Sequence, residues 1–183
     1  MDFRTTRQRR LATRLLEASS SEVGKIVREE LRDNDLVAAH FLEGSDWDGP
    51  DICVYGTRGT YTVEVCNEPF PILKAAIEAP QLDQLGGPME TPTIRKQGDA
   101  VWLVRTLHMR QDTLRRVAES FLKHQPSVWA VGSDRLKPVC VREVAKSAGL
   151  HESTVERAVA NKVMAIGGQR ILFDSLVRSI AAN

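Results

Sequence analysis

The residues best suited to bind a ligand lie close together between positions 151 and 162. They combine charged, hydroxyl and amide side chains, which can hydrogen-bond to base edges and to phosphates. The set consists of His151, Glu152, Ser153, Thr154, Glu156, Arg157, Asn161 and Lys162. Most of these residues would lie at the N-terminal end of one helix, where they could meet base edges, whereas Asn161 and Lys162 would lie further along, near phosphates. The pattern therefore predicts a DNA-binding surface.

The segment that would position these residues, 136–162, has the residue spacing of a helix-turn-helix. Ala145 is small enough to let two helices approach closely, and Gly149 can take the left-handed conformation that ends the first helix. Val155 and Ala158 would face back onto the first helix. A helical corner used only for packing is the alternative, because the same geometry occurs in proteins that never touch DNA.

Ser153 and Glu156 have the spacing of a capping box, in which the serine oxygen accepts a backbone N–H and the glutamate reaches back. This spacing predicts that the second helix begins at Ser153. The carboxylate of Glu156 would either accept a hydrogen bond from a cytosine amino group or be repelled by phosphate. We therefore expect weaker DNA binding than a neutral residue at this position would allow.

The spacing of apolar residues along the rest of the chain, and the residues that end helices and strands, predict a mainly α fold. The expected fold is a helical bundle with a small β-hairpin and a C-terminal helix-turn-helix. Ser19 with Glu22 forms another capping box, and Pro126 would end the longest helix. Glycine and proline are frequent from 80 to 98, which predicts a loop. The expected elements are helices at 6–18, 22–32, 72–78 and 101–125, strands around 52–54 and 61–65, and a wing at 169–173.

The apolar residues of two of these elements are assigned to the core. In the helix at 101–125 they are spaced by three, four or multiples of these numbers, which is typical of one buried face. In the wing, Ile171, Leu172 and Phe173 would pack beneath the second helix of the helix-turn-helix.

The sequence resembles the sigma-54 family of bacterial RNA polymerase specificity factors. The resemblance is most specific at 136–162, which reads LKPVCVREVAKSAGLHESTVERAVANK. It extends to 101–125, which reads VWLVRTLHMRQDTLRRVAESFLKHQ, to the hairpin at 50–71, and to the helical segment at 7–37.

The resemblance implies partners and further contact residues. Core RNA polymerase and promoter DNA would be the main partners, and an AAA+ ATPase activator a third. The candidate polymerase contacts are arginines on one face of the long helix, which could equally be solvated: Arg105, Arg110, Arg115 and Arg116. An apolar stripe formed by Leu11, Leu15 and Leu16 could contact the activator.

Four parts of the chain are expected from the same resemblance. They are a helical hairpin at 1–37 like the family's regulatory first region, a short acidic linker at 38–49, a core-polymerase-binding helical subdomain with a β-hairpin at 50–125, and a helix-turn-helix subdomain at 126–183. We expect that the family's separate C-terminal promoter-recognition domain is missing. Two alternatives to an initiation factor follow, a decoy that occupies core polymerase without targeting promoters and a stand-alone helix-turn-helix regulator, which would usually need to dimerise.

Composition sets the class of protein. The chain has 183 residues with 42% hydrophobic and 27% charged residues, which is enough for one or two small domains with cores. Its net charge of +1 means that affinity for DNA must come from local groups of cations. Apolar runs are far shorter than the roughly 20 residues that span a bilayer. We expect a cytoplasmic protein that is monomeric when free.

An enzymatic function, a cofactor and a metal site are not expected. The four histidines are scattered along the sequence, and neither a glycine-rich phosphate loop nor metal-ligand spacing is present. The three cysteines form no C-x-x-C pair, which favours reduced structural thiols. A cross-strand contact between Cys53 and Cys66 is left open.

Overall fold

The computed structural model describes residues 3–32, 48–57, 60–66, 92–125 and 136–179. Within these residues the fold is mainly α, as predicted. None of the described helices is long and apolar enough to cross a membrane. The elements are α1 (Phe3–Glu17), α2 (Ser20–Leu31), β1 (Ile52–Thr57), β2 (Thr60–Val65), α5 (Pro92–Lys123), β3 (Val139–Cys140), α7 (Val141–Ala148), α8 (Glu152–Val159), β4 (Val163–Ile166), β5 (Gln169–Leu172), α9 (Phe173–Leu176) and β6 (Val177–Arg178).

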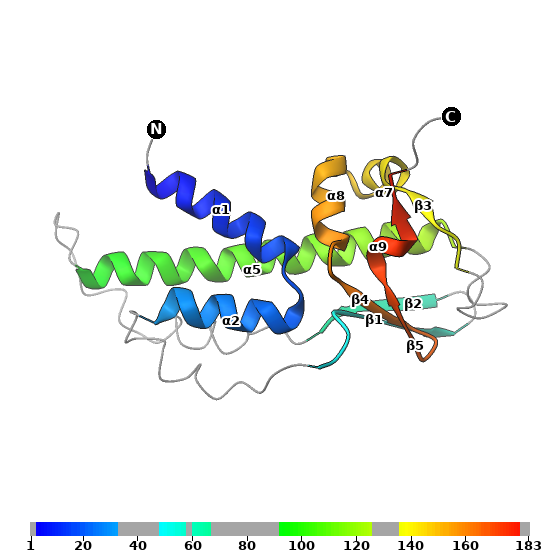
Figure 1. Cartoon of the computed structure of the whole chain (residues 1–183), viewed down its shortest axis with the longest axis horizontal. Coiled ribbons are helices and arrows are strands. Elements are labelled where there is room, and N and C mark those ends of the chain that lie inside the picture. Colours follow the sequence, from blue (N-terminus) through cyan, green and yellow to red (C-terminus); the bar gives the residue numbers. More distant parts are fainter. Residues whose placement is uncertain (1–2, 33–47, 58–59, 67–91, 126–135, 180–183) are drawn as a thin grey trace.

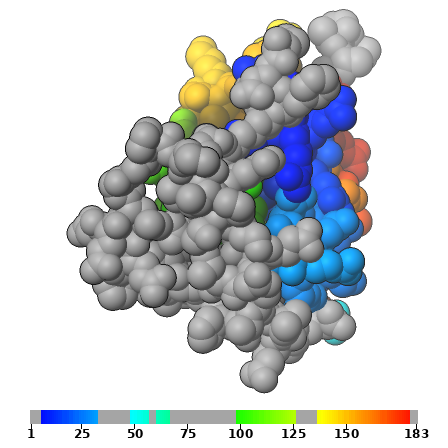
Figure 2. All heavy atoms as spheres, turned by 90° about the vertical axis from the view of Figure 1, so that its left-hand side faces the viewer, coloured from blue at the N-terminus to red at the C-terminus, as the bar shows by residue number. Residues whose placement is uncertain are grey.

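Helix α5 runs along the length of the molecule and carries the other elements (Figure 1). Its N-terminal half lies against α1 and α2, which form one continuous surface when viewed from that end (Figure 2). Its C-terminal half lies between α7 and α8 on one side and the sheet that contains β1 and β2 on the other (Figure 1). Helix α5 therefore connects two regions that differ in architecture.

Each half of α5 contributes to a separate core. The first, here the helical core, joins α1 and α2 to α5 and includes Leu15, Leu103 and Leu107. The second, here the mixed core, joins the later part of α5 to α7, α8, α9 and the sheet. In it the rings of Phe121 and Phe173 meet edge to face, with 5.6 Å between their centroids. The predicted apolar periodicity of the long helix is confirmed, and it serves both cores.

Two predicted boundaries are wrong near Gly98. The loop predicted for 80–98 is wrong from Pro92 onward, because α5 begins there. Proline is compatible with the first turn of a helix, since its missing N–H would have no partner in that turn. The rest of that loop, the short helix predicted at 72–78 and Pro126 lie outside the described residues.

The capping box at the start of α2 is confirmed. The backbone N–H of Ser19 donates to the Glu22 carboxylate at 2.8 Å, and the Ser19 hydroxyl donates to the same group at 3.0 Å. Because Ser19 is the capping residue, α2 begins at Ser20 and not at 22 as predicted.

The sheet has four strands in the order β2-β1-β4-β5. The predicted hairpin is present as β1 and β2, with Val54 opposite Val63. The predicted wing at 169–173 contains β5, which forms a second hairpin with β4, a strand that was not predicted. The turn of this hairpin, at Gly167 and Gly168, has φ values of 57° and 81°. Strand β4 pairs in parallel with β1, placing Ile166 beside Val54. This pairing joins the two hairpins into one sheet.

The three apolar residues of the wing have different environments. Phe173 is fully buried in the mixed core and Ile171 packs against it, as predicted. Leu172 is 56% exposed, so its assignment to the core is wrong. Side chains alternate between the two faces of a strand, and Leu172 lies on the face turned away from the core.

Candidate nucleic-acid interface

Helices α7 and α8 are joined by a tight turn at residues 149–151, and we call them the α7–α8 unit. Gly149 ends α7 with φ 63° and ψ 41°, the left-handed conformation that was predicted. Ala145 is buried where the helices pack, and Val155 and Ala158 face inward from α8 with no exposed surface. The predicted packing residues thus lie where the spacing placed them.

The predicted start of α8 is wrong, because the capping residue is His151 and not Ser153. The backbone N–H of Ser153 donates to Nδ1 of His151 at 3.2 Å, and the Ser153 hydroxyl lies 2.8 Å from the same nitrogen. Glu152 then occupies the first turn, where a negative charge is favoured by the helix dipole. A ring nitrogen performs the task that the sequence pattern assigned to a serine oxygen.

The polar residues of α8 and the turn before it are accessible to a ligand. His151, Glu156, Arg157 and Asn161 are exposed, whereas Glu152, Ser153 and Thr154 are half-buried. Five of them lie on the outward side of α8, because its other side is buried in the mixed core, whereas His151 lies directly before the helix and Asn161 after it.

Two of these residues form ion pairs with neighbouring helices. Arg157 lies 3.4 Å from the carboxylate of Glu17 on α1, and Glu152 lies 3.2 Å from Arg142 on α7. Between 46% and 80% of each of the four side chains is exposed, so each pair contributes little to stability and a charged ligand could replace either partner.

Lys162 must be removed from the predicted DNA contacts. Its side chain has no exposed surface. The ammonium donates to the carbonyls of Leu16 at 3.0 Å, Glu17 at 2.8 Å and Ala160 at 3.0 Å. Burial lowers the pKa of Lys162 to about 7. The residue caps the C-terminal end of α1, where a cation is favoured, and it does not face solvent.

Asp51 is a structural residue that the sequence-based reasoning missed. Its buried carboxylate accepts hydrogen bonds from the backbone N–H groups of Ser20, at the start of α2, and of Val163, in β4, the latter at 2.7 Å. One carboxylate thus holds together the N-terminal helical pair and the sheet that follows α8. Its position directly before a strand was the available signal.

Arg110 is not the surface residue that the polymerase prediction requires. Its side chain is 2% exposed and donates to the carbonyls of Leu15 at 2.9 Å and Ala18 at 3.0 Å. Burial lowers the pKa of Arg110 to about 10. The sequence carried a signal for this, because Arg110 lies three residues after Leu107 and four before Leu114, on the buried face of α5.

The other three arginines of that prediction lie on the surface. Arg105 and Arg115 are exposed. Arg116 is exposed but donates to the carbonyl of Ala148 at 2.5 Å, and it lies 3.7 Å from Asp112. Arg116 therefore already binds the C-terminal end of α7.

The leucines predicted to form an activator-binding stripe are largely used inside the protein. Leu11 and Leu15 are 8% and 0% exposed and belong to the helical core. Leu16 is partly buried and packs against the mixed core. An amphipathic stripe has the same pattern whether it covers a core or a partner, and here it covers the cores.

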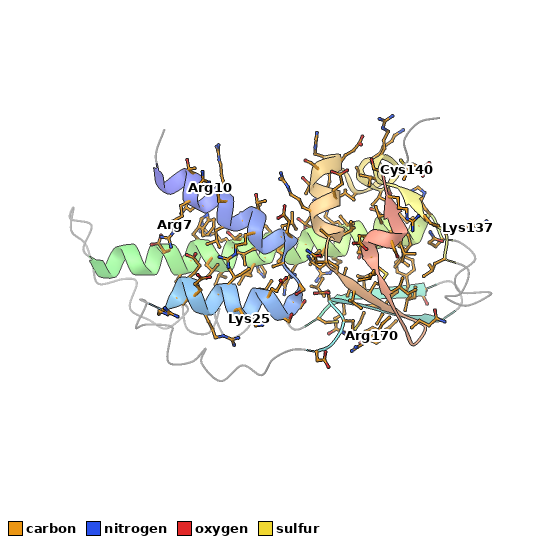
Figure 3. All side chains as sticks on the ribbon, viewed as in Figure 1. Arg7, Arg10, Lys25, Lys137, Cys140 and Arg170 are labelled. Carbon is orange, nitrogen blue, oxygen red and sulfur yellow. The ribbon has the colours of Figure 1, made fainter. Side chains whose placement is uncertain are left out.

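Charged residues on the two sides of α5 are well separated. Arg170, in β5, lies on the sheet and donates to the carbonyl of Asp48 at 3.0 Å. Figure 3 shows Arg170 below α5, whereas α8 lies above it and Lys137 and Cys140 lie near α7. The arginine of the wing is therefore not on the side of the molecule that carries α8.

Comparisons with known proteins bear on this arrangement. Residues 92–176 match the family model described as "Sigma-54, DNA binding domain". This range includes α5, which was predicted to bind polymerase, and the α7–α8 unit. The division of the chain into four functional parts remains a prediction.

Three curated relatives carry the name RNA polymerase sigma-54 factor. The protein from Vibrio anguillarum is 28% identical over 154 residues, which is 83% of this chain and 31% of the relative. The one from Xanthomonas euvesicatoria is 32% identical over 114 residues, covering 62% and 24%. The one from Escherichia coli (strain K12) is 29% identical over 117 residues, covering 63% and 24%.

The matched segments span between 24% and 31% of the length of these relatives. The match to the family model and the relatives agree with the motif at 136–162. The chain is similar to sigma-54 factors, and over residues 92–176 to their DNA-binding domain.

Proposed function

We propose that the chain acts in transcription initiation as a sigma-54-like factor, binding core RNA polymerase and contacting promoter DNA through the α7–α8 unit as a helix-turn-helix. The similarity to sigma-54 factors supports the general role. The observation that carries the DNA contact is the division of α8 into a fully buried apolar side and an accessible polar side at its N-terminal end.

The proposed DNA contacts are those members of the predicted set that reach the surface. Arg157 and Asn161 are exposed and carry groups that bind phosphate or base edges, and His151 lies at the helix start. Glu156 opposes binding to phosphate but could accept a cytosine amino group. The full proposed set is His151, Glu152, Ser153, Thr154, Glu156, Arg157 and Asn161.

Contact with core polymerase is proposed through the exposed residues of α5. Arg105 and Arg115 are retained because their side chains face solvent. Control by an AAA+ ATPase activator is proposed from the resemblance to sigma-54 factors. Any contact with the activator would use residues other than Leu11 and Leu15, which are buried. The role is that of a non-catalytic specificity subunit.

A matched pair of arginine variants tests the DNA contact. Fluorescence anisotropy with a labelled promoter duplex would compare Arg157→Ala with Arg170→Ala, an exposed arginine on the other side of α5. We expect Arg157→Ala to weaken binding about 5- to 10-fold and to reduce the salt dependence, and Arg170→Ala to leave both unchanged. Equal effects of the two variants would exclude α8 as the DNA-contacting helix.

A pull-down with purified core RNA polymerase tests the second part. Stoichiometric retention that is weakened by the double variant Arg105→Ala/Arg115→Ala supports the proposal. Absence of retention at micromolar protein would leave a DNA-binding regulator without polymerase contact.

Glu156 favours one alternative, a decoy that occupies core polymerase without targeting promoters, because an exposed carboxylate repels phosphate. Glu156→Ser separates the two functions. If the native chain retains polymerase but binds promoter DNA only after this substitution, the decoy is the correct function.

A further inference from the structure

Cys53 and Cys66 form a sulfur pair on the side of the sheet turned away from the mixed core. Cys53 lies in β1 between the core residues Ile52 and Val54, and alternation along the strand directs it to the opposite face. Cys66 directly follows β2, and its backbone N–H donates to the carbonyl of Asp51 at 2.8 Å. These two placements bring together side chains from neighbouring strands.

The two sulfur atoms are in direct contact. The thiol of Cys66 donates to Sγ of Cys53 at 2.8 Å, and both residues are reduced. A disulfide bond requires the sulfur atoms to approach to about 2.05 Å. A small movement of the two side chains would therefore bring the sulfur atoms to the distance of a disulfide bond.

The two thiols differ in exposure and therefore in access to solutes. Cys66 is buried, and burial together with its contact to Cys53 raises the pKa of its thiol to about 12. Cys53 is half-buried, so a solute in water reaches its sulfur more easily. The hydroxyl of Tyr55 also contacts this sulfur, and the hydrogen bond raises the pKa of Tyr55 to about 12.

We propose that Cys53 and Cys66 are a reversible redox pair that a hydroperoxide converts into an intramolecular disulfide. The Cys53 thiolate attacks the outer oxygen of the hydroperoxide, whose O–O bond breaks, giving Cys53 sulfenic acid and an alkoxide that takes up a proton to leave as an alcohol. The sulfur of Cys66 then attacks Sγ of Cys53. The S–O bond breaks, and the hydroxyl leaves as water with the Cys66 thiol proton. Two thiols and one hydroperoxide thus give one disulfide, one alcohol and one water.

The disulfide would act on the connection between the two regions of the molecule. Cys66 is hydrogen-bonded to the backbone of Asp51, whose carboxylate holds the start of α2 and the start of β4. A covalent bond at this position restricts the same corner of the sheet. Oxidation would therefore stabilise the placement of the sheet relative to α2.

The chain supplies its own control in Cys140. This third cysteine is also half-buried, but it lies at the start of α7, on the other side of α5 (Figure 3). Treatment of the folded protein with hydrogen peroxide, followed by alkylation under denaturing conditions and mass spectrometry, reports on all three sulfur atoms. We expect a loss of about 2 Da before alkylation, a peptide pair joined through Cys53 and Cys66, and an alkylated Cys140.

Variants make the assignment specific. The loss of about 2 Da should persist in Cys140→Ser, disappear in Cys53→Ser and in Cys66→Ser, and be reversed by dithiothreitol. Cys66→Ser should also accumulate an oxidised Cys53 that a sulfenic-acid reagent labels. Three alkylated cysteines after peroxide treatment of the native chain, or joined peptides that include Cys140, would overturn the proposal. These readouts do not depend on binding to DNA or polymerase.

Discussion

The two cores along α5 are enclosed by different kinds of secondary structure. The helical core is closed by three helices, and at its edge Arg7 and Arg14 of α1 form ion pairs with Glu30 and Glu29 of α2. The mixed core is closed by helices on one side and by a sheet on the other. Ion pairs at the surface, such as those between α1 and α2, contribute little to the free energy of unfolding. The stability of the helical core therefore depends on its apolar contacts.

The junction between the cores is polar. Arg110, Lys162 and Asp51 are buried there and bind backbone groups at the ends of α1, α2 and β4. Buried charges stabilise a structure only when their hydrogen bonds are satisfied, and they then favour one arrangement strongly over others. Apolar contacts therefore build each core, whereas directed hydrogen bonds set the position of one core relative to the other.

The strongest test of this view is Asp51→Ala. The substitution leaves the N–H groups of Ser20 and Val163 without their acceptor and removes a negative charge near Lys162, so we expect a loss of about 3–5 kcal/mol in the free energy of unfolding. Urea denaturation would measure it. Asp48→Ala is the matched control, because Asp48 is exposed and only its backbone carbonyl accepts a hydrogen bond from Arg170. A loss below about 1 kcal/mol for Asp51→Ala would show that the junction is not held by this carboxylate.

A pair of leucines on α5 tests whether the two cores are separate. Leu107 lies in the helical core and Leu114 in the mixed core, and both are fully buried. Each substitution to alanine should cost about 3 kcal/mol. Hydrogen exchange should show faster exchange in α1 and α2 for Leu107→Ala and in α7 and α8 for Leu114→Ala. The same pattern of exchange in both variants would mean that the cores open as one unit.

The pH dependence of stability reports on Lys162. Burial lowers its pKa in the folded protein to about 7, from the ordinary value of 10.5 that applies when the chain is unfolded. Between these values the unfolded state binds more protons, so this residue's contribution to stability is greatest above the ordinary pKa and is lost as the pH falls toward 7. The slope is at most about 1.4 kcal/mol per pH unit.

Urea denaturation of the native chain and of Lys162→Met at several pH values would isolate this contribution. The native chain should become more stable relative to the variant as the pH rises from about 7 toward 10.5. A difference between the two proteins that does not change with pH would contradict the assignment.

A smaller effect is expected at the start of α8, where His151 is the capping residue. His151→Ala removes the acceptor for the Ser153 N–H and should cost about 1 kcal/mol, whereas His151→Asp supplies another acceptor and should cost less. Thermal unfolding followed by circular dichroism would rank the two variants. Equal losses would show that the ring nitrogen does not stabilise the helix start.

Local features of this chain could be predicted from its sequence. The capping box of Ser19 and Glu22, the left-handed Gly149 and the apolar face of α5 each depend on residues within a few positions of one another. The hairpin of β1 and β2 was predictable for the same reason, because its strands are close together in the sequence. At the candidate interface, the spacing of apolar and polar residues along α8 correctly indicated that most of its polar residues lie on the surface.

Features that depend on distant contacts could not be predicted. Nothing within reach of Lys162 in the sequence indicates that the end of α1 lies against it, and the leucines of α1 have the pattern of any amphipathic helix. The same limit applies to the parallel pairing of β1 with β4, whose partners lie on opposite sides of α5 in the sequence. The start of α8 was predicted wrongly for a different reason. Serine is a more common capping residue than histidine, but here His151 is the capping residue and Ser153 lies within the first turn.

The parallel pairing of β1 with β4 also has a consequence for synthesis on the ribosome. Ile52 pairs with Met164, so about 110 residues are made between the two strands, which takes roughly 5–20 s at ordinary elongation rates. During that time the β1–β2 hairpin has an open edge, with backbone donors and acceptors available to any other extended chain. The nascent protein is therefore most vulnerable to aggregation after its first hairpin has emerged and before its last one has.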